Sequence, residues 1–235
     1  MFRKNNKHAY TRILVMAAIV ALVFTALLVS EVGAKPKVAP PHSRAYGKTM
    51  AEWLTIYWEW LIGGGEDKVG KVQFMPMPAG EYAGGSGEAP DDPIVFAGEL
   101  DITIEAGTPF VLPLFAWIGE RYEDGSEDPP IADEDLIDLI HPNLTIDGET
   151  IVSDDNKEAY YVGPTWFDRA IEYPEPTEYG SVAAIWHQGF GIVSLPLSEG
   201  EHVIHLWEPF TLPGYPYLAY NNTWNVTVVD EDNDD

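Results

Sequence analysis

The sequence contains no cysteine, and its 13 Lys and Arg residues stand against 38 Asp and Glu residues, a formal net charge of −25. The absence of cysteine excludes disulfide bridges, thiol nucleophiles and cysteine-ligated metals, so an apolar core must hold the fold, and a chain of this length can bury one. The shortage of basic residues excludes nucleic acid and anionic membrane surfaces as partners, because binding to either depends on Lys and Arg.

The amino end has the order of a secretory signal peptide. Four basic residues come first, an apolar run follows at residues 13–29, and the small residues Val32, Gly33 and Ala34 close the segment. This order predicts cleavage after Ala34 and a secreted or cell-surface protein. The apolar run has 17 residues, just under the length that spans a bilayer, so the alternative is a membrane anchor through an uncleaved N-terminal segment.

The remainder of the chain has the composition of a single domain. Residues 35–45 combine Pro, Lys and small residues without periodicity, so we expect an extended leader there. Residues 46–229 are expected to form the domain, and residues 230–235 are an acidic tail that we expect to be disordered. No segment after residue 34 is long and apolar enough to span a membrane.

The stretch AEWLTIYWEW, residues 51–60, places four large aromatic side chains within eight residues. Thr49 and Glu52 match a capping box and three glycines follow Ile62, so we expect a helix from about Thr49 to Ile62. The aromatic residues follow the i, i+4, i+7 spacing of one helix face. Burial of this face against a core is favoured over a ligand platform, because an exposed aromatic patch of this size would promote aggregation.

Strand signals dominate the rest of the sequence. Asp147 and Gly148 lie between two short β-branched runs, which is typical of a two-residue hairpin turn. Many short strands with one early helix and no βαβ alternation predict a mainly β fold, an antiparallel β-sandwich of the jelly-roll or immunoglobulin-like kind with an N-terminal Trp-rich helix. Expected strands lie at residues 94–107, 109–117, 143–146, 149–152, 159–162, 182–195, 203–207 and 224–229.

Several segments resemble one group of proteins. AYGKTMAEWLTIYWEWLI, residues 45–62, is similar to the opening of a group of uncharacterised secreted bacterial and archaeal proteins, in which an AEW segment is followed by WW or YW and a further Trp. IVFAGEL, ITIEAGTPFVLPLF, YYVGPTWF and GFGIVSLPLSEGEHVIHL resemble later strands and turns of the group, so the resemblance covers most of residues 46–229. It implies a shared fold and carries over no activity. The acidic insertion at residues 120–135 departs from the group.

Paired carboxylates beside aromatic rings are the chemistry of glycan hydrolysis, and they define the catalytic candidates Glu52, Glu59, Glu99 and Asp101. Glu52 and Glu59 lie two helical turns apart, roughly 10 Å along the axis, which suits an inverting pair only inside a cleft. A solvated stripe, with Glu52 as the helix cap, is the favoured interpretation. Neither a GxSxG motif nor a Walker glycine loop is present, which disfavours a Ser nucleophile and nucleotide chemistry. Candidates for ligand binding through aromatic rings are Trp58, Trp117, Trp166 and Trp186.

The candidate transition-metal ligands are His187, His202 and His205. Residues three apart in a strand point to opposite faces, so His202 and His205 need a bulge to share one metal. His187 could meet either of them across neighbouring strands, with Glu99, Glu201 or Glu208 as a further ligand. Ordinary hydrogen-bonded histidines are the favoured interpretation.

The acidic loops offer carboxylates for a structural calcium ion, with Asp124, Asp128 and Asp154 as candidate ligands. None of these clusters has EF-hand spacing, and a chain this acidic forms clusters through composition alone. Calcium is therefore the one cofactor considered, in a structural and not a catalytic role.

These observations favour a non-catalytic binding or structural module that acts outside the cell on an unknown extracellular ligand or surface. An extracellular glycan hydrolase is the alternative. Two carboxylates about 5–10 Å apart in an aromatic-walled cleft would favour the hydrolase, whereas buried tryptophans and dispersed carboxylates would favour the module.

Overall fold

The computed structural model of the protein describes residues 37–212 and 214–230. The predicted signal peptide and nearly all of the predicted acidic tail lie outside the described residues. None of the helices in the described ranges is both long and apolar enough to cross a membrane.

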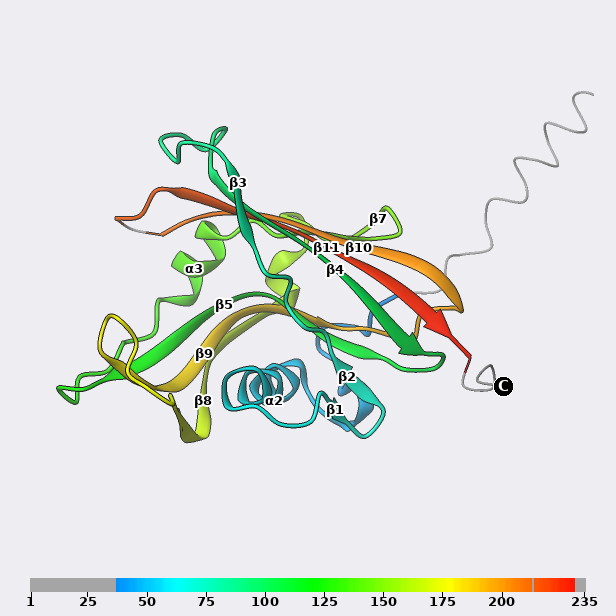
Figure 1. Cartoon of the computed structure of the whole chain (residues 1–235), viewed down its shortest axis with the longest axis horizontal. Helices are drawn as coiled ribbons and strands as arrows, with labels where there is room; N and C mark the ends of the chain where they lie inside the picture. Colours follow the sequence, from blue (N-terminus) through cyan, green and yellow to red (C-terminus); the bar gives the residue numbers. More distant parts are fainter. Residues whose placement is uncertain (1–36, 213, 231–235) are drawn as a thin grey trace, which may run out of the picture. The chain divides into compact units, whose positions relative to one another are not determined.

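Two sheets make up most of the described chain (Figure 1). The five-stranded first sheet has the order β1-β2-β5-β9-β8, and the six-stranded second sheet has the order β3-β4-β11-β10-β6-β7. The helices are η1 (Ala45–Gly47), α2 (Met50–Gly63), α3 (Asp133–Leu139) and η2 (Lys157–Tyr160). The strands are β1 (Lys68–Val69), β2 (Val72–Phe74), β3 (Glu81–Gly84), β4 (Ile94–Glu105), β5 (Phe110–Tyr122), β6 (Asn143–Ile146), β7 (Glu149–Val152), β8 (Tyr161–Glu172), β9 (Ser181–Val193), β10 (Gly200–Thr211) and β11 (Tyr217–Val229).

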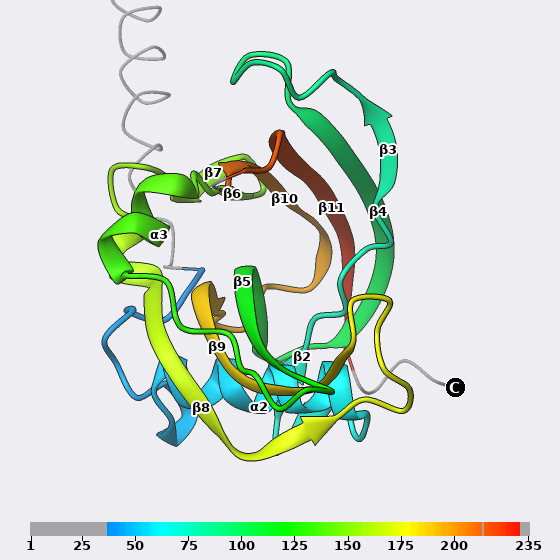
Figure 2. The ribbon, with the colours of Figure 1, turned by 90° about the vertical axis from the view of Figure 1, so that its left-hand side faces the viewer.

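The protein is therefore mainly β and sandwich-like, as predicted, with two sheets that face each other (Figure 2). Most neighbouring strands are antiparallel, but β2 runs parallel to β5, and β4 runs parallel to β11 along its whole length. The prediction of antiparallel pairing is wrong for these two pairs, because side-chain alternation along a strand does not reveal the direction of its partner.

The turn between β6 and β7 forms as the sequence predicts. Asp147 has φ +52° and Gly148 has φ +77°, which is the left-handed backbone that a tight two-residue hairpin requires. Asp and Gly adopt this conformation more readily than other residues because of a short polar side chain and a missing Cβ, respectively.

Helix α2 covers the face of the first sheet that is turned away from the second sheet (Figures 1 and 2). Its start is a capping box, in which the Thr49 side chain accepts a hydrogen bond from the backbone N–H of Glu52. Three side chains of α2 itself are buried against the first sheet, namely Trp53, Leu54 and Tyr57. A Cβ on Gly191 of β9 would lie 2.6 Å from a Leu54 methyl group, so glycine permits this close approach. Part of the aromatic face thus belongs to the core.

The strands β10 and β11 pair in antiparallel register across the middle of the second sheet. Their alternate residues are buried, as expected for strands with one wet face. Two residues in these buried positions are polar, Glu208 on β10 and Asn222 on β11. Burial of a polar side chain costs free energy unless the side chain forms hydrogen bonds, so these two residues indicate a candidate functional site.

Candidate ligand-binding cavity

A cavity of about 270 Å³ lies at the edge of the sandwich, and we call it the edge cavity. It is bounded by α2, by the segment between β2 and β3, by β5 and by β11. The residues that line it are Trp58, Met77, Pro78, Gly80, Pro113, Leu114, Phe115, Ala116, Tyr220 and Asn222. The lining is mostly apolar and aromatic, with one amide, which is typical of small-molecule sites.

The edge cavity lies along a part of β5 that has no neighbouring strand on one side. The short strand β2 pairs with β5 only at Phe110 and Val111, and none of the described strands pairs with this edge from Leu112 to Gly119. A register shift between Pro113 and Phe115 also bends the strand here. Proline has no N–H to donate, so it fits an unpaired edge position.

Two buried aromatic residues hold the outer wall of the edge cavity. The Tyr57 hydroxyl donates a hydrogen bond to the Met75 carbonyl at 2.7 Å, and the Trp224 indole N–H donates to the Pro76 carbonyl at 2.7 Å. Both contacts fix the segment that leads from β2 to Pro78 and Gly80. The wall is also close to β4, since a Cβ on Gly98 would lie 2.7 Å from the Pro78 Cβ.

The aromatic rings of the lining continue into the core. The ring centroids of Phe115 and Phe210 are 5.4 Å apart, and those of Phe210 and Tyr220 are 5.2 Å apart. Phe210 is buried, whereas Tyr220 is 37% exposed. Tyr220 therefore connects the interior to the mouth of the edge cavity.

Unpaired polar atoms gather beside this cavity. Asn222 lines it and is 4% exposed, and its Oδ1 atom has no hydrogen-bond partner among the described residues. Glu208 is fully buried, and neither of its carboxyl oxygens has a partner there. Burial raises the pKa of Glu208 well above its usual value. An unpaired buried polar atom costs about 1–3 kcal/mol, so a donor from outside the described residues that reached these three atoms would be strongly favoured.

The strand register places these atoms close to each other. Glu208 is directly opposite Tyr220 in the β10–β11 pair, and Asn222 is two residues further along β11. Directly opposite residues have Cβ atoms about 4.5–5.5 Å apart, and diagonal neighbours about 7–8 Å. Burial, with the nearby Glu208 as a second cause, raises the pKa of Tyr220. Glu208 thus lies on the same face of the sheet as Tyr220 and Asn222 and next to both, although it does not itself line the edge cavity.

One of the four candidate tryptophans lines the edge cavity, namely Trp58. Trp117 on β5 is partly buried against the core. Trp186 on β9 is 1% exposed and donates its indole N–H to the Asp128 carbonyl at 3.1 Å. Trp166 on β8 is 59% exposed and lies over Trp186, with ring centroids 6.5 Å apart. The structure therefore does not gather the four rings into one site.

The four candidate carboxylates fall into two separate places, Glu52 and Glu59 on α2, and Glu99 and Asp101 together on β4. Glu52 caps α2 and forms an ion pair with Arg44. Partial burial, followed by the neighbouring Asp168, raises the pKa of Glu59. Glu99 and Asp101 lie on exposed positions of β4, and both accept hydrogen bonds from the Asn225 amide, at 2.7 and 2.9 Å. None of the four lines the edge cavity.

The three candidate histidines have separate partners. Nε2 of His187 lies 2.9 Å from the Thr55 hydroxyl, and Nε2 of His205 lies 2.8 Å from Oδ1 of Asn221. His202 contacts Asp147 and Ser198 instead. The described residues contain no group of three or more His, Asp or Glu side chains placed to hold a metal ion.

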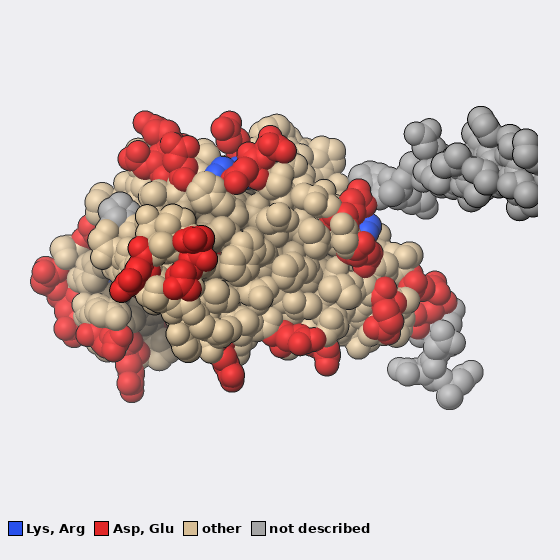
Figure 3. Space-filling model, turned by 90° about the horizontal axis from the view of Figure 1, so that it is seen from above, with Lys and Arg blue, Asp and Glu red and all other residues tan. Residues whose placement is uncertain are grey.

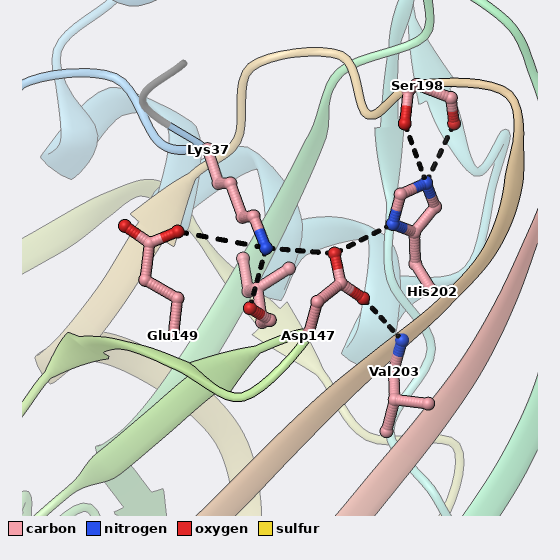
Figure 4. A network of polar contacts seen from close by, with 7 residues as sticks. Lys37, Asp147, Glu149, Ser198, His202 and Val203 are labelled. Atoms are coloured by element: carbon pink, nitrogen blue, oxygen red, sulfur yellow. Dashed lines mark hydrogen bonds and ion pairs between the residues drawn. The ribbon is translucent and has the colours of Figure 1, made fainter. Parts of the chain in front are cut away.

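The contacts of His202 resemble a Ser-His-Asp arrangement (Figure 4). Nδ1 of His202 lies 2.9 Å from Asp147, and Nε2 lies 3.4 Å from the Ser198 hydroxyl. However, Nε2 is closer to the Ser198 carbonyl, at 2.8 Å, and a carbonyl oxygen can only accept. Nε2 therefore carries a proton and cannot take one from the hydroxyl, as a catalytic base must.

This network instead joins three segments. Lys37 donates to the Ile146 carbonyl at 2.7 Å and to Asp147 at 2.9 Å, and Asp147 also accepts from the Val203 N–H at 3.0 Å (Figure 4). Partial burial would raise the pKa of Asp147, but the hydrogen bonds from Lys37 and His202 outweigh it and lower this pKa to about 2. The contacts secure the start of the described chain against the β6–β7 turn.

The candidate calcium ligands are engaged with protein donors. Asp124 accepts from the Ser126 hydroxyl at 2.6 Å, and Asp128 accepts from the Tyr122 hydroxyl at 3.0 Å. Asp154 forms an ion pair with Lys157 at 2.9 Å. The three carboxylates belong to different local networks, so the structure does not bring them together.

Sequence reasoning considered Glu208 only as an extra metal ligand and did not consider Asn222. The signal for Glu208 was present in the pattern of β10, where Ile204, Leu206 and Phe210 alternate with outward residues and Glu208 occupies the remaining inward position. A carboxyl residue within an apolar alternation is a marker of a buried polar site.

No family model matches the chain, and searches of curated proteins and of solved structures find no significant match. The resemblance to a group of secreted bacterial and archaeal proteins therefore stays a prediction.

Proposed function

We propose that this chain is a secreted, non-catalytic binding module that holds one small, largely apolar ligand in the edge cavity. The observation that carries the proposal is an aromatic cavity whose lining includes the unpaired amide oxygen of Asn222, with the unpaired carboxyl group of Glu208 on the neighbouring strand. Its volume of about 270 Å³ is near the lower limit for ligand pockets, so it suits a molecule of few heavy atoms. Export rests on the predicted signal peptide, and the jelly-roll or immunoglobulin-like classification also stays a prediction.

The glycan hydrolase has less support. Its mechanism needs two carboxyl groups that flank one bond, about 5–10 Å apart. The lining of the edge cavity includes no carboxylate, and the four candidate carboxylates occur on α2 and on the exposed face of β4. The arrangement therefore supports binding better than hydrolysis.

Three probes of nearly the same shape test the proposal: choline, its neutral carbon analogue 3,3-dimethylbutan-1-ol, and the anion 3,3-dimethylbutanoate. Each would be titrated into the protein while the unfolding temperature and the binding heat are measured. A ligand at 100 times its dissociation constant stabilises the folded state by about 2.7 kcal/mol. We expect at least one probe to bind and to raise the unfolding temperature.

A cavity-filling variant provides the specificity control. Ala116→Leu adds three carbon atoms to a residue that lines the edge cavity and should abolish binding of every probe. Ala83→Leu adds the same atoms on the exposed strand β3 and should leave binding unchanged. Binding that survives Ala116→Leu, or no binding by any of the three probes, would contradict the proposed function.

A further inference from the structure

The unpaired atoms beside the edge cavity also indicate the charge of its ligand. Two oxygens of Glu208 and one of Asn222 find no donor within the described residues. The Asn222 oxygen accepts hydrogen bonds only, and so do both oxygens of Glu208 once it is ionised, so a partner that supplies hydrogen-bond donors or positive charge would satisfy all three. This inference rests on the proposed function and deepens it.

We propose that the ligand is a small organic cation with an alkylammonium group, and that Glu208 is its buried counter-ion. Trp58, Phe115 and Tyr220 line the cavity, and the faces of aromatic rings carry negative potential that attracts ammonium groups. Glu208 does not itself line the cavity, but its buried side chain is directly opposite Tyr220 on the neighbouring strand and diagonal to Asn222, and both of these residues do line it. Aromatic faces and a carboxylate together form the usual environment for such cations.

The surface charge favours the same class of ligand. Asp and Glu outnumber Lys and Arg by 38 to 13 in the chain, and the face shown in Figure 3 carries many acidic and few basic side chains. A field of this sign concentrates cations near the protein and repels anions. No Lys or Arg lines the edge cavity, so an anionic ligand would find no counter-ion there.

A metal ion fits this site less well than an organic cation. Calcium takes six to eight oxygen ligands and magnesium near-ideal octahedral geometry, whereas Glu208 and Asn222 together offer three unpaired oxygens. Of the lining residues, only Trp58, Tyr220 and Asn222 have side-chain nitrogen or oxygen atoms. An alkylammonium group requires little direct coordination, because its methyl or methylene groups pack against aromatic rings.

Binding should release a proton. Without ligand, burial favours the neutral carboxyl group of Glu208, whereas a bound cation favours the carboxylate. The carboxyl proton leaves to solvent, and the positive charge of the ligand replaces it. Tyr220 is the titratable group that faces Glu208 from β11, and its own pKa is raised by burial and by that carboxyl group, so it stays neutral. Affinity for the cation should therefore rise with pH.

The same three probes test this inference. We expect choline to bind about ten-fold more tightly than 3,3-dimethylbutan-1-ol, which corresponds to about 1.4 kcal/mol, and 3,3-dimethylbutanoate to bind least. Calorimetry in two buffers with different ionisation heats should show proton release with choline alone. If the neutral analogue binds as tightly as choline, the proposal of a cationic ligand is refuted, whereas the proposed binding function still stands. If no probe binds, both proposals fail.

Two sets of variants assign the roles. Glu208→Gln keeps the shape of the side chain and should remove both the preference for choline and the proton release, while 3,3-dimethylbutan-1-ol still binds. Trp58→Leu should weaken choline more than the neutral analogue, and Trp58→Phe should retain most of the preference because it keeps an aromatic face. A preference for choline that survives Glu208→Gln would refute Glu208 as counter-ion. The Trp58 pair gives an independent answer if Glu208→Gln does not fold.

Discussion

Protonation of His187 is expected to loosen helix α2 from the first sheet. This residue is 1% exposed on β9, and its Nε2 atom lies 2.9 Å from the Thr55 hydroxyl of α2. The Thr55 hydroxyl donates its single proton to the Ala51 carbonyl at 2.9 Å, so Nε2 must be the donor to Thr55 and Nδ1 carries no proton. Acid would therefore place a charge on a buried ring that packs 5.6 Å from Phe167.

The size of the effect follows from the pKa. Burial lowers the pKa of His187 to about 4, whereas the unfolded chain has a His pKa of about 6.5. Between these values the unfolded state holds a proton that the folded state lacks, so the contribution is fully present above about pH 6.5 and is lost as the pH falls toward 4. At about 1.4 kcal/mol per pH unit, the loss across this window sums to about 3 kcal/mol.

Urea unfolding of the wild type and of His187→Gln at a series of pH values measures this loss. Glutamine can still donate to Thr55 but does not titrate. Other acidic groups titrate alike in both proteins, so the difference between their free energies of unfolding isolates His187. We expect the wild type to lose about 3 kcal/mol relative to the variant between about pH 6.5 and 4. Parallel pH profiles, or an imidazole that titrates near its ordinary pKa by NMR, would refute the reasoning.

Three further substitutions test the packing at Gly119, the helix cap at Thr49 and the buried carboxyl group of Glu208. Gly119→Ala should destabilise the protein by about 3 kcal/mol in urea unfolding, since the new Cβ would lie 1.9 Å from the indole of Trp186; a loss below about 0.5 kcal/mol would contradict this packing. Thr49→Ala should cost about 1 kcal/mol by the same measurement, because it removes the side-chain cap of α2, whereas an unchanged midpoint would show that the cap is unimportant. Glu208→Gln should gain stability over the wild type as the pH rises above about 4.5, because the pKa of the buried acid is raised on folding and its contribution is lost at higher pH; a constant difference would contradict this sign.

The sequence predicts features of the fold that depend on local chemistry. The Asp147–Gly148 turn and the capping box at Thr49 each rest on a few adjacent residues, and both occur in the structure. The parallel partnership of β4 with β11 joins segments more than a hundred residues apart in sequence, and nothing in either strand encodes the other's direction. The partner and direction of strands that are distant in sequence therefore could not be predicted from this one sequence.

The candidate site shows the same division. Trp58 could be proposed from its residue type. The edge cavity, however, depends on the pairing of β2 with β5, which stops at Val111, and on the position of the segment through Pro78. Those are properties of the assembled sheets. Asn222 could not be distinguished by type from other polar strand residues, although it lies in a buried position between Ala219 and Trp224.

The contrast between two buried ionisable residues, Lys157 and Glu208, supports the assignment of Glu208. Lys157 is 7% exposed, and its ammonium group donates to the Ile140 carbonyl at 2.8 Å and pairs with Asp154 at 2.9 Å. The fold thus supplies partners where it buries that charge, as the desolvation cost requires. Glu208 receives none from the described residues, and it lies beside the aromatic cavity. A donor from outside the described residues would satisfy this carboxyl group, and the aromatic lining of the neighbouring cavity is the observation that favours the small organic cation proposed above.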